Sequence, residues 1–385
     1  MITKTLFKSN FLKEIKKIIL LLSTVFIFLV FWANRTSFCP ENIVLWAKNM
    51  LFLFKINKNI SSDLLENNIS KQNIKSVGNN FVILGNNSFS FLDKNGCTLR
   101  SQRHNLSNPC VKSSGPRAII YDIGGKKINI ETICGNILKK ETKKETISCS
   151  ISESGTYGVL TNSQSYLSEL KIYNEKNIKK FEYYFSEHYI CDVELNSTGE
   201  ECLCCGVFAE NGDVSSYIYV LDFKQKTPKI KLQINDNLIT KIKYLNNKNI
   251  LAIGDNFVSI INLNSKNIKN YLYNGKFLKF YDFKKDKGIC YCLVPDLESN
   301  QNYEIHVINT LKKETIFSVN CQNIKDILYT GNRVFILHDS GISSYNVNGK
   351  LEKTITTNNI FEMVFGNSNS FLYAIDKNHV SKIKI

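Results

Sequence analysis

Cysteines are the residues of this sequence whose type and spacing could most directly do chemistry, because thiolates bind zinc and pair as disulfides. The 385-residue chain contains 12 of them; Cys202, Cys204 and Cys205 form one group, and Cys290 and Cys292 form another. Residues two apart on a strand share a face, so each group could present two thiolates together. The groups occupy the same position in repeats that are not neighbours, too far apart to share one zinc ion. We therefore predict no metal site and expect these cysteines to pack as small hydrophobic residues.

Cys97 and Cys110 bracket a short loop between the first two repeats of the chain. They are the best candidates for a disulfide, because a bridge between them would persist in an oxidising compartment outside the cell. Anaerobic hosts often do without such bridges, so two free thiols are the alternative.

The remaining residues that could support catalysis lie in patterns that match no known site. The segment Gly124 to Lys127 lacks the upstream glycine of a phosphate-binding loop, and the chain has no G-x-S-x-G elbow of a serine hydrolase. We therefore predict no catalytic residue and no cofactor. The five histidines are dispersed without metal-binding spacing: His104, His188, His306, His338 and His379.

The charge balance excludes one class of partner. Lys and Arg outnumber Asp and Glu by 49 to 34, for a formal net charge of +15, but the positive residues are mostly Lys and are spread along the whole chain. A nucleic-acid groove more often clusters Arg with exposed aromatic residues. We predict a solvated basic surface and no nucleic-acid partner.

An uncharged apolar stretch near the N-terminus predicts a membrane span. Residues 18–33 have the sequence IILLLSTVFIFLVFWA, close to the lower limit of the roughly 17–25 residues that cross a bilayer. Trp32 suits the far interface, and Lys residues dominate the sixteen or so residues before the stretch. By the positive-inside rule we expect a cytoplasmic basic tail over residues 1–17, a transmembrane helix over residues 18–35, and export of the rest.

The alternative is a cleaved signal peptide, which also has a basic start and an apolar run. No small-x-small cleavage site follows the run, because Asn34, Arg35 and Phe38 stand where alanine would be needed. We therefore expect an uncleaved, single-pass anchor in the cell membrane, with an extracytoplasmic C-terminal domain.

Residues 36–73 are expected to hold a juxtamembrane helix and a polar tether. Pro40 followed by Glu41 is a helix-start signal, and the apolar residues from Ile43 to Phe54 are too few for a second span. This helix would lie in the membrane interface or pair with a partner, or else pack on the globular domain. The polar stretch from Lys55 to Asn73 would be the tether.

From residue 74 onward the sequence repeats, and the repeat predicts a β-propeller. Short apolar segments recur every ~35–50 residues, which is the interval of four-stranded propeller blades. The only tryptophans, Trp32 and Trp46, precede the repeats, so WD40 and quinoprotein signatures are absent. The apolar segments are residues 81–85, 117–121, 157–160, 201–205, 250–253, 289–293, 334–337 and 371–374.

We therefore predict an all-β propeller over residues 74–385, with eight blades, or seven if the first and last units share one. The last unit ends at Ile385 and is one strand short. We expect a strand from near Ile74 to close the ring, because closure removes exposed sheet edges.

Three segments resemble an uncharacterised family of single-span membrane proteins from clostridia-type bacteria that carries a domain of unknown function (DUF5711). They are residues 40–43, residues 103–109 and residues 115–125. The likeness covers most of the chain, although the family more often has Arg at the place of Ile123 and Gly at the place of Pro116. It implies an exported, propeller-like domain on an N-terminal anchor, and it implies no activity.

The third segment has a physical interpretation of its own. Gly124 and Gly125 lie between two strand-like runs, as a hairpin with positive-φ turn positions requires, and Tyr121 precedes them. Arg117 and Asp122 could pair across that hairpin. We predict a structural role for this motif.

Two functions are compatible with the sequence. The first is a binding or scaffolding module at the cell surface that recruits a protein or a cell-wall polymer. The second is a glycan- or peptide-processing enzyme with carboxylates from several blades at the central channel. We favour binding, because the sequence contains no motif for chemistry; two close carboxylates of raised pKa in a deep central pocket would favour the enzyme.

Overall fold

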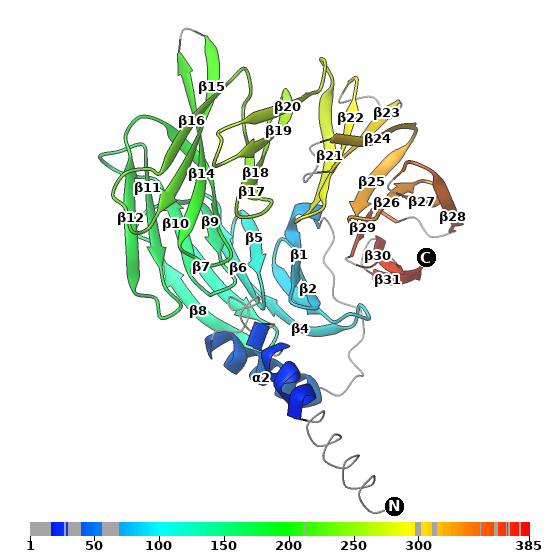
Figure 1. The fold of residues 1–385 in the computed structure, drawn as a ribbon, viewed down its shortest axis with the longest axis horizontal. Helices are drawn as coiled ribbons and strands as arrows, with labels where there is room; N and C mark the ends of the chain where they lie inside the picture. Colours follow the sequence, from blue (N-terminus) through cyan, green and yellow to red (C-terminus); the bar gives the residue numbers. More distant parts are fainter. Residues whose placement is uncertain are drawn as a thin grey trace, which may run out of the picture.

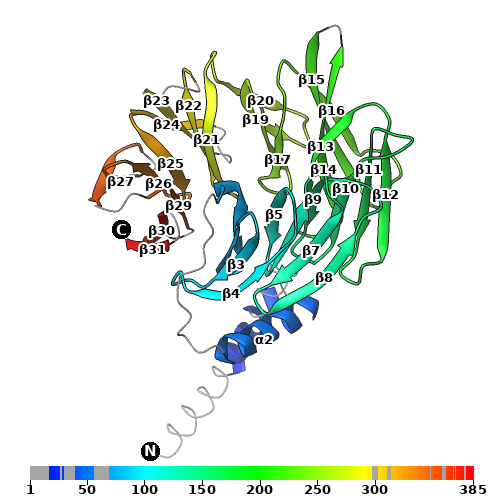
Figure 2. The ribbon, with the colours of Figure 1, turned by 180° about the vertical axis from the view of Figure 1, so that it is seen from behind.

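A computed structural model shows that the chain folds as a ring of eight β-sheets with an N-terminal helical region on its outside (Figure 1). Seen from behind, the ring runs in the opposite sense and the helical region again lies outside it (Figure 2). The structure describes residues 17–26, 28–29, 40–55, 69–210, 212–296, 302–309, 314–346, 348–357, 361–366, 368, 370–376 and 379–385.

The first four blades are consecutive antiparallel sheets, each built from four neighbouring segments of the chain. Blade 1 contains β1 (Ile74–Val77), β2 (Asn80–Leu84), β3 (Ser88–Leu92) and β4 (Thr98–Arg103). Blade 2 contains β5 (Pro109–Ser114), β6 (Arg117–Asp122), β7 (Lys127–Thr132) and β8 (Gly135–Glu141). Blade 3 contains β9 (Thr146–Ile151), β10 (Tyr157–Thr161), β11 (Ser168–Tyr173) and β12 (Lys179–Phe185). Blade 4 contains β13 (Tyr189–Leu195), β14 (Glu201–Glu210), β15 (Asp213–Asp222) and β16 (Ile230–Asn235).

The second half of the ring continues in the same order. Blade 5 contains β17 (Lys241–Tyr244), β18 (Asn249–Ile253), β19 (Phe257–Asn262) and β20 (Ile268–Leu272). Blade 6 contains β21 (Phe277–Lys284), β22 (Gly288–Val294), β23 (Tyr303–Asn309) and β24 (Glu314–Cys321). Blade 7 contains β25 (Ile324–Tyr329), β26 (Arg333–His338), β27 (Gly341–Asn346) and β28 (Leu351–Thr356). Blade 8 contains β29 (Met363–Phe365), β30 (Phe371–Asp376) and β31 (His379–Lys384).

The eight predicted blades are confirmed, and the apolar segments of the sequence explain them. Each of those segments forms the second strand of its blade, from β2 in blade 1 to β30 in blade 8. These strands are almost completely buried, because they lie inside a sheet that packs on a neighbouring blade through each face. A continuous apolar run is therefore expected there, whereas the outer strands alternate with exposed residues.

The predicted closure by a strand from near Ile74 is wrong. β1 pairs with β2 inside blade 1, and the described residues of blade 8 form three strands that pair only with one another. Side-chain packing closes the ring instead: Phe81 of blade 1 lies with its ring centroid 5.1 Å from those of Phe365 and Tyr373 in blade 8. Aromatic packing at this seam replaces a shared ladder of backbone hydrogen bonds.

The helix predicted after Pro40 is confirmed as α2 (Pro40–Lys55). Residues 17–26 and 28–29 are also helical. Within the described residues, no helix is both long enough and apolar enough to cross a membrane. Parts of the predicted transmembrane helix, and the tether over residues 56–68, lie outside the described residues, whereas Ile69 is buried against blades 1 and 8.

Candidate functional site at the ring axis

The first strand of each blade lies nearest the ring axis (Figure 1). Charged side chains from six of these strands, and from the segment just before β1, come together there. We call this set the axial cluster. It contains five Lys and four carboxylates: Lys71, Lys75, Lys112, Lys241, Lys243, Asp192, Glu194, Asp282 and Asp326. The short 3-10 helix η1 (Lys71–Asn73) supplies Lys71.

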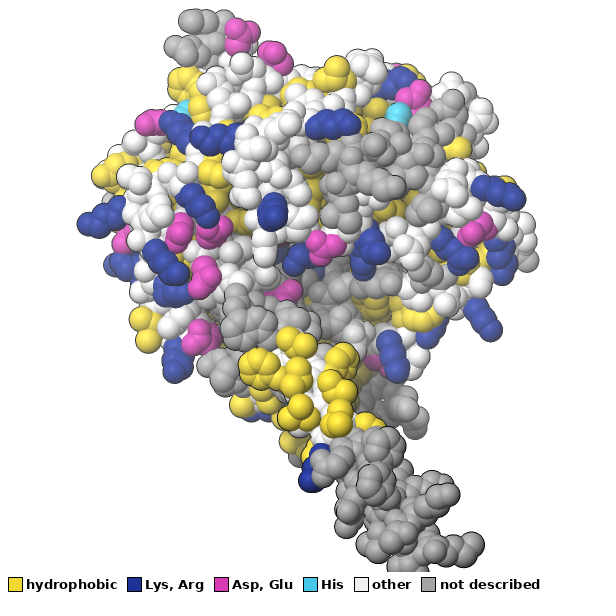
Figure 3. Space-filling model, in the orientation of Figure 1, with side chains coloured by type: hydrophobic (Ala, Val, Ile, Leu, Met, Phe, Trp, Pro, Cys, Tyr) yellow, Lys and Arg dark blue, Asp and Glu magenta, His cyan; other side chains and the backbone are white. Residues whose placement is uncertain are grey.

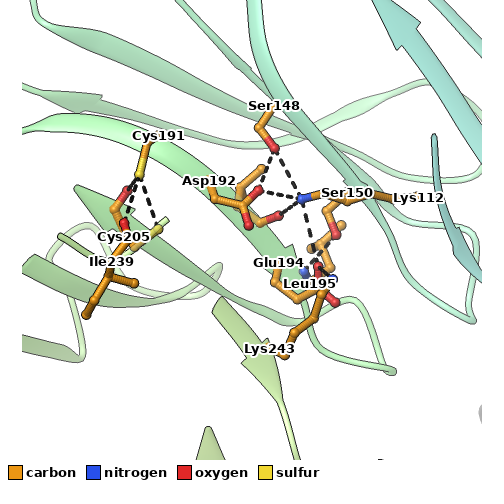
Figure 4. Close-up of polar contacts among 11 residues, drawn as sticks. Lys112, Ser148, Ser150, Cys191, Asp192, Glu194, Leu195, Cys205, Ile239 and Lys243 are labelled. Carbon is orange, nitrogen blue, oxygen red and sulfur yellow. Dashed lines mark hydrogen bonds and ion pairs between the residues drawn. The ribbon is translucent and has the colours of Figure 1, made fainter. Parts of the chain in front are cut away.

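The centre of the cluster is a buried ion pair between Lys112 of β5 and Asp192 of β13. Lys112 Nζ lies 2.6 Å from Asp192 Oδ1 and also donates to Ser148 Oγ at 3.1 Å and to the Val193 carbonyl at 2.7 Å. Ser148 Oγ donates to the same carboxylate oxygen at 2.8 Å (Figure 4). The pair thus links blades 2, 3 and 4 through charge-assisted hydrogen bonds.

The two partners shift each other's ionisation. Burial alone would lower the pKa of Lys112, but the Asp192 carboxylate outweighs this effect and raises the pKa. Burial alone would raise the pKa of Asp192, but Lys112, followed by Lys241 and Lys243, lowers it to about 2. Both groups are therefore charged at neutral pH.

Three more ion pairs lie in the axial cluster, the longest being that of Lys112 with Glu194, at 3.9 Å. Glu194 of β13 accepts from Lys243 of β17 at 2.7 Å, which ties blade 4 to blade 5. Lys71 Nζ lies 2.7 Å from Asp326 Oδ1 and also donates to the Ile327 carbonyl, so the chain preceding β1 is fastened to blade 7.

Asp282 and Asp326 hold neighbouring blades together. Asp282 Oδ2 accepts the Tyr329 N–H of blade 7 at 2.8 Å, and Asp326 Oδ2 accepts the Val364 N–H of blade 8 at 2.9 Å. Their Oδ1 atoms accept the N–H of the next residue on their own strands. Burial raises the pKa of both carboxyl groups, and the nearby Lys71 opposes the rise.

Lys75 and Lys241 are the two lysines of the cluster that belong to none of these ion pairs. Neither makes a hydrogen bond or ion pair with any residue that the structure describes, and both are partly exposed. Burial, followed by the charge of Lys243, lowers the pKa of Lys75 to about 8. The nearby Asp282 carboxylate opposes this lowering for Lys75 without forming an ion pair with it. The arrangement can accept an anionic group, because neither ammonium group is engaged by a carboxylate and the cluster carries one more cation than anions.

The residues of the predicted hairpin motif lie in blade 2, where Arg117 and Asp122 each form hydrogen bonds with other parts of the chain. Arg117 and Asp122 are the first and last residues of β6; Arg117 donates to Asn42 of α2 and, at 3.2 Å, to the Glu153 carbonyl. Asp122 accepts the Asn108 N–H at 2.7 Å.

The two glycines of this motif occupy the β6–β7 turn, and Tyr121 is buried between blades 2 and 3. Gly124 has φ +77°, as the hairpin prediction requires. At Gly125 a Cβ would lie 2.2 Å from the Asp122 carboxylate, so only glycine fits.

The cysteines of the two sequence groups lie on the second strands of blades 4 and 6. All five are buried in hydrophobic clusters between blades: Cys202, Cys204, Cys205, Cys290 and Cys292. Cys97 lies exposed in the β3–β4 turn, Cys110 lies half-buried on β5, and both are free thiols.

A closer cysteine pair lies beside the axial cluster, where sequence analysis did not place one. Cys191 Sγ lies 3.4 Å from Cys205 Sγ, because a bulge between Ile190 and Asp192 turns Cys191 toward β14 (Figure 4). The hydrogen bond from the Cys205 thiol lowers the pKa of Cys191, and the same contact raises the pKa of Cys205. Cys191 is half-buried, so an oxidant can reach the more acidic thiol.

We expect mild oxidation of the purified protein with diamide to join Cys191 to Cys205, with loss of one hydrogen atom from each thiol. Peptide mapping under non-reducing conditions should find the two cysteines in one linked peptide pair. Cys205→Ser should abolish the link, and Cys202→Ser, a change to the same residue type on the same strand, should leave it. A linked peptide containing Cys97 and Cys110 instead would show that the sequence-based pairing is correct.

The axial cluster could have been found from a signal in the sequence. Charged residues alternate with branched apolar ones in β13 and β17, the first strands of blades 4 and 5. The sequences are Asp192-Val193-Glu194 and Lys241-Ile242-Lys243. A period of two places both charges of each strand on one face. The ring determines which of these strands become neighbours. The sequence of a single repeat does not indicate those neighbours.

Comparisons with known proteins identify the family and the fold. The model of a family of unknown function, DUF5711, matches residues 55–385. A search of curated proteins finds no significant match. Among solved structures, BamB from Moraxella catarrhalis has a TM-score of 0.50 at 11% identity, covering 83% of this chain and 96% of its own. The C-terminal WD40 domain of Sif2 has a TM-score of 0.54 at 13% identity, covering 84% of this chain and 99% of its own.

These two likenesses are of fold alone, because so few residues are identical. The family match covers most of the chain, including the whole propeller. The chain therefore belongs to the DUF5711 family, with an eight-bladed β-propeller as its main domain.

Proposed function

We propose that this protein is a membrane-anchored binding or scaffolding module, whose propeller lies outside the cytoplasm and takes acidic groups of a protein or cell-wall polymer at the ring axis. The observation that carries the proposal is the surplus of cations in the axial cluster, where Lys75 and Lys241 form no ion pair or hydrogen bond with a described residue. The ring holds strands β1 and β17, which carry these two residues, so the backbone needs little ordering when a ligand binds.

The N-terminal sequence supports the anchor and its orientation. Residues 18–33 contain no charge, and basic residues precede them, as in a single-pass protein with a cytoplasmic N-terminus. The side chains of the described helical residues here are largely exposed, with Leu20 at 67% and Phe26 at 67%. So many exposed apolar side chains on one helical segment are more stable in lipid than in water.

An enzyme acting on glycans or peptides is the second candidate, because Asp282 and Asp326 are two axial carboxyl groups of raised pKa. Each of their four oxygen atoms already accepts a backbone N–H. A general acid must release its proton to a substrate, and these carboxyl groups are engaged in joining blades. We therefore favour binding over catalysis.

The test uses the full chain expressed in a clostridia-type host, with fluorescent polyphosphate and polyglutamate as two separate probes. Intact protoplasts should retain at least one probe. Lys75→Gln with Lys241→Gln should lose most of that retention, because the two lysines without an ion pair are removed. Lys226→Gln with Lys248→Gln, two exposed lysines of blades 4 and 5, is the control of equal charge change.

Each outcome of this test has one meaning. Polyphosphate retention supports a phosphate-bearing polymer, and polyglutamate retention supports an acidic protein. Retention only after the protoplasts are permeabilised would place the propeller inside the cell and refute the orientation. Equal loss in both double variants would refute the axial site, because any exposed lysine would then serve.

A further inference from the structure

Helix α2 is fastened to the propeller by a stripe in which polar and apolar residues alternate. Asn42 is only 5% exposed; it donates to the Glu153 carbonyl at 2.9 Å and accepts from Arg117. Leu45 is buried next to it, and Phe52 packs on the hydrophobic cluster between blades 1 and 2. These positions follow one another at helical spacing, so they form one stripe that faces the protein.

The opposite side of α2 is apolar and exposed. The exposed fractions are 46% for Ile43, 62% for Trp46, 61% for Leu51 and 82% for Phe54. These residues also recur at intervals of three and four, and Ala47 and Met50 lie within the same stripe. We call this stripe the outer face; it contains no charged or hydrogen-bonding side chain apart from the indole of Trp46.

A surface helix in water exposes polar residues on its outer side, whereas the outer face of α2 is apolar. Figure 3 shows hydrophobic side chains gathered into one patch where α2 and the N-terminal helical residues lie. Large continuous apolar patches on a folded protein indicate a surface that is covered by something apolar.

The position of α2 in the chain indicates what covers it. Only residues 34–39 separate the apolar segment 18–33 from Pro40. A fully extended link of that length spans about 25 Å at most, so α2 begins close to wherever the apolar segment lies. A 16-residue helix is about 24 Å long, too short to cross the ~30 Å hydrocarbon core itself.

We propose that α2 lies flat in the membrane interface, with its outer face in the lipid and the stripe of Asn42, Leu45 and Phe52 on the propeller. The inference rests on the proposed membrane anchor. Trp46 then lies at the level of the headgroups, where its amphipathic ring is favoured. Lys48, at the side of the helix, can reach anionic lipid headgroups.

The consequence for function is a fixed orientation. Because Asn42, Arg117 and Glu153 join α2 to blades 2 and 3, the side of the ring formed by blades 1 to 3 is held toward the bilayer. Blades 5 to 7 are then turned away from it (Figure 1). A partner would therefore meet the ring in one fixed orientation relative to the membrane. A domain that tumbled freely on a flexible tether would have no fixed orientation.

The experiment uses the full chain in vesicles of phosphatidylcholine and phosphatidylglycerol whose acyl chains carry bromine near the headgroup. Trp32→Phe leaves Trp46 as the sole tryptophan, and Trp46→Phe leaves only Trp32. We expect the shallow bromines to quench Trp46 fluorescence strongly, and aqueous acrylamide to quench it weakly. Quenching of Trp32 by brominated lipid reports the anchor independently.

The two tryptophans separate the failure of this inference from that of the proposed function. If Trp32 is quenched by lipid and Trp46 only by acrylamide, the anchor stands and the interfacial helix is refuted. If neither is quenched by lipid, both proposals fail together.

A second pair of variants tests the outer face directly. Leu51→Glu with Phe54→Glu should remove most of the lipid quenching of Trp46 while the melting temperature of the propeller stays unchanged, because both side chains are largely exposed. The control is Leu272→Glu with Leu351→Glu, two exposed leucines of blades 5 and 7 at 60% and 48% exposure. Lipid quenching equal to that of the parent protein in the first variant would overturn the proposal.

Discussion

Replacing Lys112 with Met is expected to lower the free energy of unfolding of the propeller by about 3–5 kcal/mol, because it leaves the Asp192 carboxylate buried without its cation. Asp192 is 1% exposed, and Lys112 is its closest charged partner. The loss should be measured by urea unfolding at pH 7, with the free energy taken from the midpoint and the slope.

The matched control replaces both partners. Lys112→Met with Asp192→Leu should be more stable than Lys112→Met alone, because two apolar side chains of similar volume leave no buried charge. If the single variant loses less than about 1 kcal/mol, the pair behaves as an exposed ion pair and the buried axial cluster is not formed as described.

The pH dependence of this pair has a definite sign. The pKa of Asp192 is lowered to about 2, so its contribution is complete above the unfolded value near 4 and is lost as the pH falls from ~4 toward 2. The pKa of Lys112 is raised, so its contribution is complete below the unfolded value near 10.4 and is lost as the pH rises above it. The difference between the parent protein and Lys112→Met should therefore be largest between about pH 4 and 10.

Replacing Asp326 with Ala is expected to destabilise the seam between blades 7 and 8, with a loss of about 3–5 kcal/mol. The change removes the acceptor of the buried Val364 N–H and leaves Lys71 without its carboxylate. No strand pairing joins blade 8 to blade 1; their seam consists of aromatic packing and hydrogen bonds from Tyr373 and Lys382 to the β3–β4 turn. We therefore expect blade 8 to open first. Hydrogen exchange should show the amide of Val364 losing its protection well before the amides of β10 in blade 3.

Asp326→Asn provides the contrast. Burial raises the pKa of Asp326, so the charged form costs stability above the folded pKa, and the cost disappears as the pH falls through that value. The neutral amide avoids this cost and keeps one acceptor, so Asp326→Asn should lose less than Asp326→Ala at pH 7. Equal losses would show that the charge on Asp326, and not its acceptor geometry, joins the blades.

The blade number was predictable because each blade contributes a buried second strand whose apolar run is visible in one repeat. The way in which the ring closes was not predictable, because it depends on which strand pairs with the segment after Asn73. The same segment could pair with blade 8 or with β2, and the short hairpin at Gly78 and Asn79 makes pairing with β2 local and therefore favourable.

The candidate site was less predictable than the fold for a related reason. Lys112 and Asp192 are separated by 80 positions, and Lys71 and Asp326 by 255. Each residue taken alone is an ordinary charged residue of a strand, and only the ring makes them neighbours. Arg117 shows the same limit: its partner Asn42 belongs to α2, outside the repeats on which the hairpin prediction relied.

The outer strands of the blades give a physical reason for the basic composition of the chain. Each blade ends in a strand with one side unpaired, and an unpaired strand can add to the edge of another molecule and start aggregation. Every outer strand except β24 carries an exposed Lys or Arg, such as Arg103 in β4, Lys180 in β12 and Lys353 in β28. A second copy that docks edge to edge would bring these like charges together. The positive charges on the outer strands, which contribute to the net charge of +15, therefore oppose self-assembly at every blade edge that carries them.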